Sequence, residues 1–106
     1  MTAAFVDDLL FRSKIRAVAG HTGADVKFIR AVDDPALGGA ALAIVDLDGK
    51  DAITTVSGLV AGWPSLRVLG FVSHVHAERI REARAAGASE VMARSAFVNA
   101  LPDLLT

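Results

Sequence analysis

Hydrophobic and polar positions along this chain alternate between two spacings. Compact apolar runs rich in β-branched residues predict strands, and apolar residues three and four positions apart predict amphipathic helices. In the first helical stretch, Phe11, Ile15 and Val18 share one face while basic residues occupy other positions. The pattern predicts strands at 3–6, 25–32, 41–47, 66–72 and 89–93. It predicts helices from 9 to about 20, at 53–60, at 76–87 and at 96–105.

This order of strands and helices predicts an α/β fold. Right-handed crossovers between successive strands give an open, five-stranded parallel sheet of flavodoxin-like order 2-1-3-4-5, with helices on both faces. The segment DDPALGG between the second and third strands is too short for a full crossover helix. We therefore predict that the second helix is short or missing. No repeat or linker-like stretch appears, so residues 1–106 are expected to form a single domain.

Composition narrows the possible partners. The chain is 53% hydrophobic and 22% charged, which argues against disorder, and its net charge of −1 provides no general attraction to nucleic acid or to anionic membranes. It has no cysteine, so disulfides, thiolate metal sites and thiol redox chemistry are excluded. The longest apolar run, at 40–45, is too short to span a membrane. We expect a cytoplasmic protein without a nucleic-acid or membrane partner.

Two acidic pairs follow predicted strands, and they differ in their surroundings. Asp7-Asp8 ends the first strand directly before a helix, and Asp46 ends the neighbouring third strand. The carboxyl ends of these strands meet at one sheet edge, so the three carboxylates should converge and offer Mg²⁺ the oxygen ligands it prefers. Helix capping is the alternative explanation for Asp7-Asp8. Asp33-Asp34 precedes a proline at the sheet edge, where turn and cap chemistry explains it.

The chain resembles response-regulator receiver domains over nearly its whole length. The acidic pair, Asp46 and the stretch AAGASEVMARSAF at 85–97 fall in the order that this family shows. The resemblance implies that Asp46 accepts a phosphoryl group from a histidine kinase or phosphotransfer protein. It implies that Asp7, Asp8, Asp46 and the backbone carbonyl of Asp48 bind Mg²⁺. We expect a stand-alone signalling module rather than an enzyme, as a monomer or weak dimer.

Two positions depart from the family pattern. A Ser or Thr that ends the fourth strand and a Lys that ends the fifth contact the phosphoryl group in the family. Here either Val72 or Ser73 takes the first position, and Arg94 takes the second. Arg94 could bind phosphate, or it could pair with Asp46 and silence it. Valine offers no donor to a phosphoryl oxygen, so we expect Asp46 to accept phosphate poorly.

The resemblance also suggests a surface for a downstream signalling protein. This surface combines the helix at 76–87, the strand at 89–93 and the last helix. It would carry Arg81, Arg84 and other charges without an apolar excess, which suits a transient interface.

Two other function classes compete with this interpretation. The first is a pseudo-receiver, a constitutive protein-interaction module with a silenced acidic site. The second is a small enzyme of the same fold, which ranks low because no base–nucleophile pair is visible. Gly49-Lys50 lacks the upstream glycine of a phosphate-binding loop, and His74 and His76 have no third metal ligand of matching type nearby.

Overall fold

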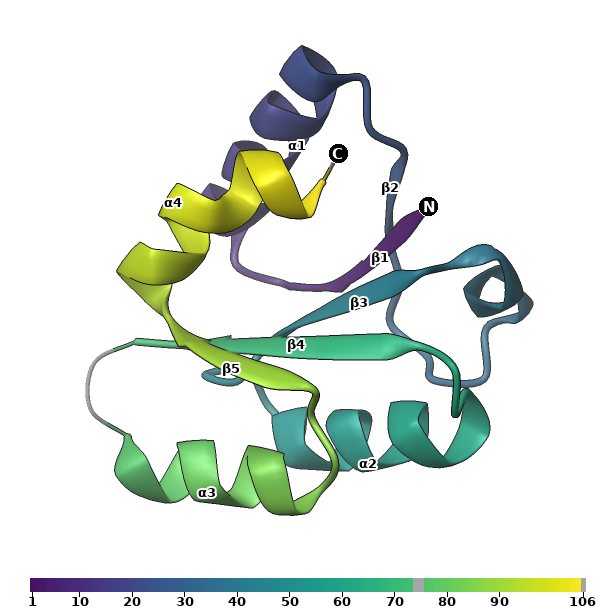
Figure 1. Ribbon diagram of the computed structural model, residues 1–106, viewed down its shortest axis with the longest axis vertical. Coiled ribbons are helices and arrows are strands. Elements are labelled where there is room, and N and C mark those ends of the chain that lie inside the picture. The colour runs from purple at the N-terminus through teal and green to yellow at the C-terminus, as the bar shows by residue number, and fades with distance from the viewer. Residues whose placement is uncertain (74–75, 106) are drawn as a thin grey trace.

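The computed structural model, which describes residues 1–73 and 76–105, contains one parallel sheet of order β2-β1-β3-β4-β5 (Figure 1). The strands are β1 (Thr2–Phe5), β2 (Val26–Phe28), β3 (Leu42–Asp46), β4 (Arg67–Val72) and β5 (Glu90–Ala93). The helices are α1 (Leu9–Thr22), α2 (Ala52–Gly62), α3 (Ala77–Ala85) and α4 (Arg94–Leu104). The predicted fold class and strand order are confirmed. No helix in the described part of the chain is long and apolar enough to cross a lipid bilayer.

Strand β3 is the centre of the sheet, and all of its residues are buried. Its side chains alternate between two hydrophobic layers. Ala43 and Val45 pack with residues of α2 and α3, whereas Leu42 and Ile44 pack with residues of α1 and α4. Figure 1 shows these two helix pairs on opposite faces of the sheet. Burial of both faces explains why the strand is continuously apolar until Asp46.

The connection between β2 and β3 replaces the missing crossover helix with a 3₁₀ helix, η1 (Pro35–Gly39). The Asp34 side chain accepts a hydrogen bond from the Ala36 amide at 2.9 Å, so the predicted cap chemistry at the second acidic pair is confirmed. The Trp63 indole holds this connection from α2 by donating a 2.8 Å hydrogen bond to the Val32 carbonyl. The predicted short second helix is therefore confirmed, with a local cap at its start and one tertiary hydrogen bond to the chain before it.

Replacing Trp63 with phenylalanine should lower the free energy of unfolding by about 1 kcal/mol, because the half-buried Val32 carbonyl loses its donor. The measurement is urea denaturation followed by circular dichroism, with the exposed Ser65→Ala as the control from the same segment. Equal urea midpoints for Trp63→Phe and the wild-type protein would show that this hydrogen bond does not hold the connection.

Several element boundaries differ from the sequence-based prediction, and two of these differences matter for the sheet and the site. The strand predicted at 25–32 forms only over Val26–Phe28, because its single neighbour β1 is four residues long. One more hydrogen bond, from the Ile29 amide to the Ala4 carbonyl, follows before the pairing ends. The last helix begins at Arg94 rather than at residue 96, directly after β5. This early start places Arg94 at the carboxyl edge of the sheet.

Candidate functional site

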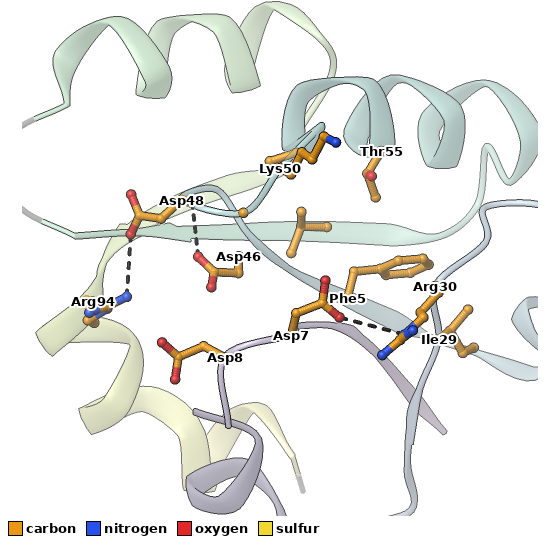
Figure 2. Close-up of a pocket in the computed structure, with 13 residues that line it drawn as sticks. Phe5, Asp7, Asp8, Ile29, Arg30, Asp46, Asp48, Lys50, Thr55 and Arg94 are labelled. Carbon is orange, nitrogen blue, oxygen red and sulfur yellow. Dashed lines mark hydrogen bonds and ion pairs between the residues drawn. The ribbon is translucent and has the colours of Figure 1, made fainter. Parts of the chain in front are cut away.

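A hollow of about 460 Å³ opens at the carboxyl edge of β1 and β3 (Figure 2). Its lining carries acidic and basic side chains together: Asp7, Asp8, Asp46, Asp48, Arg30, Lys50 and Arg94. The structure thus brings the four aspartates predicted from the sequence to one place. The cause is topological, because β1 and β3 are adjacent parallel strands whose carboxyl ends share an edge.

Asp46 is the buried carboxylate of this hollow. It is the last residue of β3 and is 8% exposed. Burial raises the pKa of its carboxyl group above the ordinary value. The Asp48 amide acts against this rise by donating a hydrogen bond to Oδ1 at 3.0 Å. The negative charge of Asp48 raises the pKa of Asp46 further, and the positive charge of Arg94 lowers it. Among the described residues, no hydrogen bond reaches Oδ2. The Asp46 carboxylate therefore has one oxygen fixed and one available.

The two members of the first acidic pair have different contacts. Asp8 caps α1, since its Oδ1 accepts hydrogen bonds from the amides of Leu10 at 2.9 Å and Phe11 at 3.2 Å. Asp7 turns the other way and lies 3.8 Å from Arg30, with both side chains more than four-fifths exposed (Figure 2). Such an exposed ion pair contributes little to stability. The capping alternative is thus observed for Asp8, although the residue also lines the hollow.

Asp48 uses its side chain as well as its backbone. Its Oδ2 accepts a 2.8 Å hydrogen bond from the Ser73 amide. The same oxygen lies 3.5 Å from Nη2 of Arg94 (Figure 2). Arg94 therefore pairs with Asp48 and does not lock Asp46, which corrects the alternative in which it would pair with the candidate phosphoacceptor. The Arg94 guanidinium also lies over the Phe11 ring, 4.4 Å from its centroid.

The choice between Val72 and Ser73 follows from the register of the sheet. Asp46 is paired with Phe71 across β3 and β4, and paired residues of parallel strands face the same side. Val72 faces the other layer, where it is fully buried in the core shared with α2 and α3. Its side chain is not among those that line the hollow. Ser73 follows in the alternation, and its amide already contacts the Asp48 side chain.

The acidic residues suit a hard divalent cation by their chemistry, because carboxylate oxygens are the ligands such ions prefer. In the described ranges, however, no three acidic or histidine side chains are gathered closely enough to hold a metal ion. The side chains of Asp7 and Asp48 are turned towards Arg30 and Arg94. The donor set fits, and these two ion pairs explain why the carboxylates are not grouped around one point.

Several residues of the site carried no functional signal in the sequence. Phe11 fits the apolar face of a helix, so nothing in the sequence indicated that its ring contacts the Arg94 guanidinium. Arg30 and Lys50 line the hollow from loops, where basic residues are common. His76 precedes α3 without a side-chain capping bond, and His74 lies outside the described residues.

No protein-family model and no curated protein matches the chain. The structure is similar to the receiver domain of NtrX from Brucella abortus, with a TM-score of 0.80 and 16% identity, covering 98% of this chain and 93% of that one. It is also similar to longer NtrX solved with ADP, with a TM-score of 0.77 and 17% identity, covering 97% of this chain and 24% of that one.

A third similar structure contains the modification that the sequence suggested. This response regulator from Burkholderia pseudomallei was solved with a phosphorylated aspartic acid, a calcium ion and citrate. It matches with a TM-score of 0.74 and 18% identity, covering 99% of this chain and 65% of that one. At these identities the likeness establishes the fold, and function depends on the site.

Proposed function

We propose that this chain, which has the fold of response-regulator receiver domains, is a signalling module of a cytoplasmic two-component system and is phosphorylated on Asp46. The observation that carries the proposal is the position of Asp46. It is a buried carboxylate at the carboxyl edge of the central strand, with Arg94 and the Ser73 amide nearby and with one oxygen that accepts no hydrogen bond from the residues described in the structure. A histidine kinase or phosphotransfer protein would be the phosphoryl donor.

The reaction is a transfer of one phosphoryl group. An oxygen of the Asp46 carboxylate attacks phosphorus, and a new O–P bond forms. The N–P bond of the donor phosphohistidine breaks, and its electron pair stays with the imidazole nitrogen. The product is an acyl phosphate on Asp46, and its three oxygens carry charge that must be matched by nearby donors and cations.

Asp8, Asp46 and the backbone carbonyl of Asp48, with Asp7 beside them, would hold Mg²⁺. When bound there, Mg²⁺ supplies positive charge to the carboxylates and to the phosphoryl oxygens. Residues of the chain also orient the Asp46 carboxylate for the reaction. The Asp48 amide fixes Oδ1 of Asp46 at 3.0 Å and leaves Oδ2 for attack.

The direct test is a titration with beryllofluoride, a phosphoryl analogue, in the presence of Mg²⁺. We expect amide resonances at Asp46, Asp48 and Ser73 to shift in the two-dimensional NMR spectrum of the wild-type protein. The control is Asp33→Asn, which removes one carboxylate from the second acidic pair and should respond like the wild type. A spectrum that beryllofluoride and Mg²⁺ leave unchanged would support the pseudo-receiver alternative instead.

The pseudo-receiver alternative has one observation in its favour. The Asp48 carboxylate already engages Arg94 and the Ser73 amide, the groups expected to meet a phosphoryl group. In that alternative, the module binds its partner constitutively and Asp46 has no chemical role. Its downstream surface would still be the one formed by α3, β5 and α4, where exposed Arg81 lies 3.5 Å from Glu78.

The phosphoryl donor would dock at the start of α1. In the described part of the chain, Leu9 and Leu10 are the exposed large hydrophobic residues, at 75% and 81%, and they follow Asp8 directly. Covering one such leucine contributes about 1.5–3 kcal/mol, which is roughly tenfold or more in affinity. We therefore expect Leu10→Gln to slow phosphotransfer about tenfold from any phosphohistidine donor that labels the wild-type protein.

Two measurements make this docking prediction specific. Labelling by acetyl phosphate, which needs no docking, should proceed equally in Leu10→Gln and in the wild type. The matched control is His21→Gln, an exposed position near the other end of α1. Equal phosphotransfer rates for Leu10→Gln, His21→Gln and the wild type would place the donor elsewhere.

A further inference from the structure

The ends of β4 and β5 present two anion-binding groups side by side. Val72 and Ala93 are paired in the sheet, so the residues that follow them, Ser73 and Arg94, lie next to each other. The Ser73 amide and the Arg94 guanidinium both point at Oδ2 of Asp48, at 2.8 and 3.5 Å. Backbone amides and guanidinium groups are the donors with which proteins bind phosphoryl and carboxylate oxygens.

Arg94 is held in this position by its surroundings. Its guanidinium lies 4.4 Å from the centroid of the Phe11 ring, and that ring stacks on Phe71 of β4 with a centroid distance of 5.1 Å. Its Nε is buried and has no hydrogen-bond partner among the described residues. The guanidinium therefore lies between the Phe11 ring and the Asp48 carboxylate.

Asp48 is held equally close to the reactive carboxylate. Its amide donates to Oδ1 of Asp46 at 3.0 Å, and the Gly49 amide donates to the Asp46 carbonyl at 3.1 Å. This tight turn keeps the Asp48 carboxylate beside the Ser73 amide and Arg94, so its effective concentration at these two groups is high. A phosphoryl group on Asp46 would need the same two donors, which Asp48 already occupies.

The family resemblance assigns an oxyanion subsite to the Ser73 and Arg94 positions, and we propose that in this chain the Asp48 carboxylate is its built-in ligand. A tetrahedral oxyanion must displace Asp48 before it can bind there. That this oxyanion is the phosphoryl group of Asp46 rests on the proposed function. The competition between Asp48 and an oxyanion for the Ser73 amide and Arg94 does not depend on it. Asp48 thus sets how readily the site accepts its anion.

Inorganic phosphate is the probe that tests the subsite without any transfer reaction. In Asp48→Ala, we expect the Ser73 amide resonance and the Nε–H resonance of Arg94 to shift, because the amide loses its acceptor and the guanidinium loses the carboxylate that faces its Nη2. Added phosphate should move both signals back, with an affinity about tenfold or more above that of the wild type. The control is Asp51→Asn, which removes one negative charge from the same loop at an exposed position without a side-chain cap bond.

The outcomes separate this inference from the proposed function. Equal phosphate affinity in Asp48→Ala and the wild type, or a Ser73 amide that the substitution leaves unmoved, would overturn it. If phosphate behaves as expected but beryllofluoride with Mg²⁺ binds neither protein, the subsite stands and phosphorylation of Asp46 fails. If beryllofluoride binds both proteins equally well, phosphorylation stands and Asp48 is not a competitor. The Asp48→Asn variant, which keeps the side-chain size, should bind phosphate with an affinity between those of Asp48→Ala and the wild type.

Discussion

Acetyl phosphate with Mg²⁺ should add one phosphoryl group to the wild-type chain and none to Asp46→Asn. A neutral amide is not a nucleophile towards phosphorus, so the expected loss is complete. The other acidic residues of the hollow are poor substitutes, because Asp8 caps α1 and Asp48 is engaged by Ser73 and Arg94. Intact-mass spectrometry over time provides the measurement. We expect modification of the wild type to be slow, since the phosphoryl group competes with Asp48.

Asp33→Asn is the matched control for this experiment, because it removes a carboxylate from the turn before η1 and should be modified like the wild type. Modification of Asp46→Asn to the same extent would identify a different acceptor. A wild-type chain that stays unmodified, with Asp48→Ala also unmodified, would instead favour the pseudo-receiver.

The same variant has a second readout in stability. Burial raises the pKa of Asp46 in the folded protein, so the ionised carboxylate is disfavoured there relative to the unfolded chain. The stability contributed by this group is fully present below the unfolded-state pKa and is lost as the pH rises through the folded-state pKa. At pH 7, Asp46→Asn should therefore be more stable than the wild type, by on the order of 1 kcal/mol or roughly 4 °C in melting temperature.

Thermal unfolding at two pH values checks the sign. The difference between Asp46→Asn and the wild type should vanish below about pH 4, where the aspartic acid is neutral in both states. The asparagine oxygen can still accept the hydrogen bond from the Asp48 amide, so the local turn is retained. A variant that is less stable than the wild type at pH 7 would contradict the assignment of Asp46 as a disfavoured buried charge.

Removing the Phe71 ring should lower the free energy of unfolding by about 3–5 kcal/mol, which is a large part of the total stability of a small domain. Phe71 is fully buried, and its ring lies 4.3 Å from the centroid of Phe97 and 5.1 Å from that of Phe11. These three rings join β4, α4 and α1 on one face of the sheet. Urea denaturation of Phe71→Ala, followed by circular dichroism, provides the measurement.

Two further variants make this result interpretable if Phe71→Ala does not fold. Phe71→Leu keeps most of the apolar volume and should lose roughly 1 kcal/mol or more through the ring contacts. Leu10→Ala shortens a side chain that is 81% exposed and should change stability by less than about 0.5 kcal/mol. If Phe71→Leu and Leu10→Ala lose equally little, the three-ring stack does not hold the two helices on the sheet.

The fold could be predicted from the sequence because its signals are local and repeated. Continuously apolar strands such as LAIVD alternate with amphipathic stretches, and this alternation admits few topologies. Boundaries were less predictable, because they depend on the neighbour. Residues after Phe28 have strand-like composition, yet beyond the hydrogen bond from the Ile29 amide to the Ala4 carbonyl the pairing with β1 ends. The reduced second helix followed from the short DDPALGG segment, but its anchor on Trp63 did not.

The sequence by itself determined that Asp7, Asp8, Asp46 and Asp48 come to one edge of the sheet. Asp7 and Asp8 follow β1, whereas Asp46 ends β3 and Asp48 follows it, and adjacent parallel strands must end on the same side. Only the tertiary structure decided which groups these carboxylates contact. An arginine side chain is long and has several carboxylates within reach, so its partner depends on what lies around it. Here the Phe11 ring from α1 and the Ser73 amide, 25 residues from Asp48, direct Arg94 to Asp48 instead of Asp46.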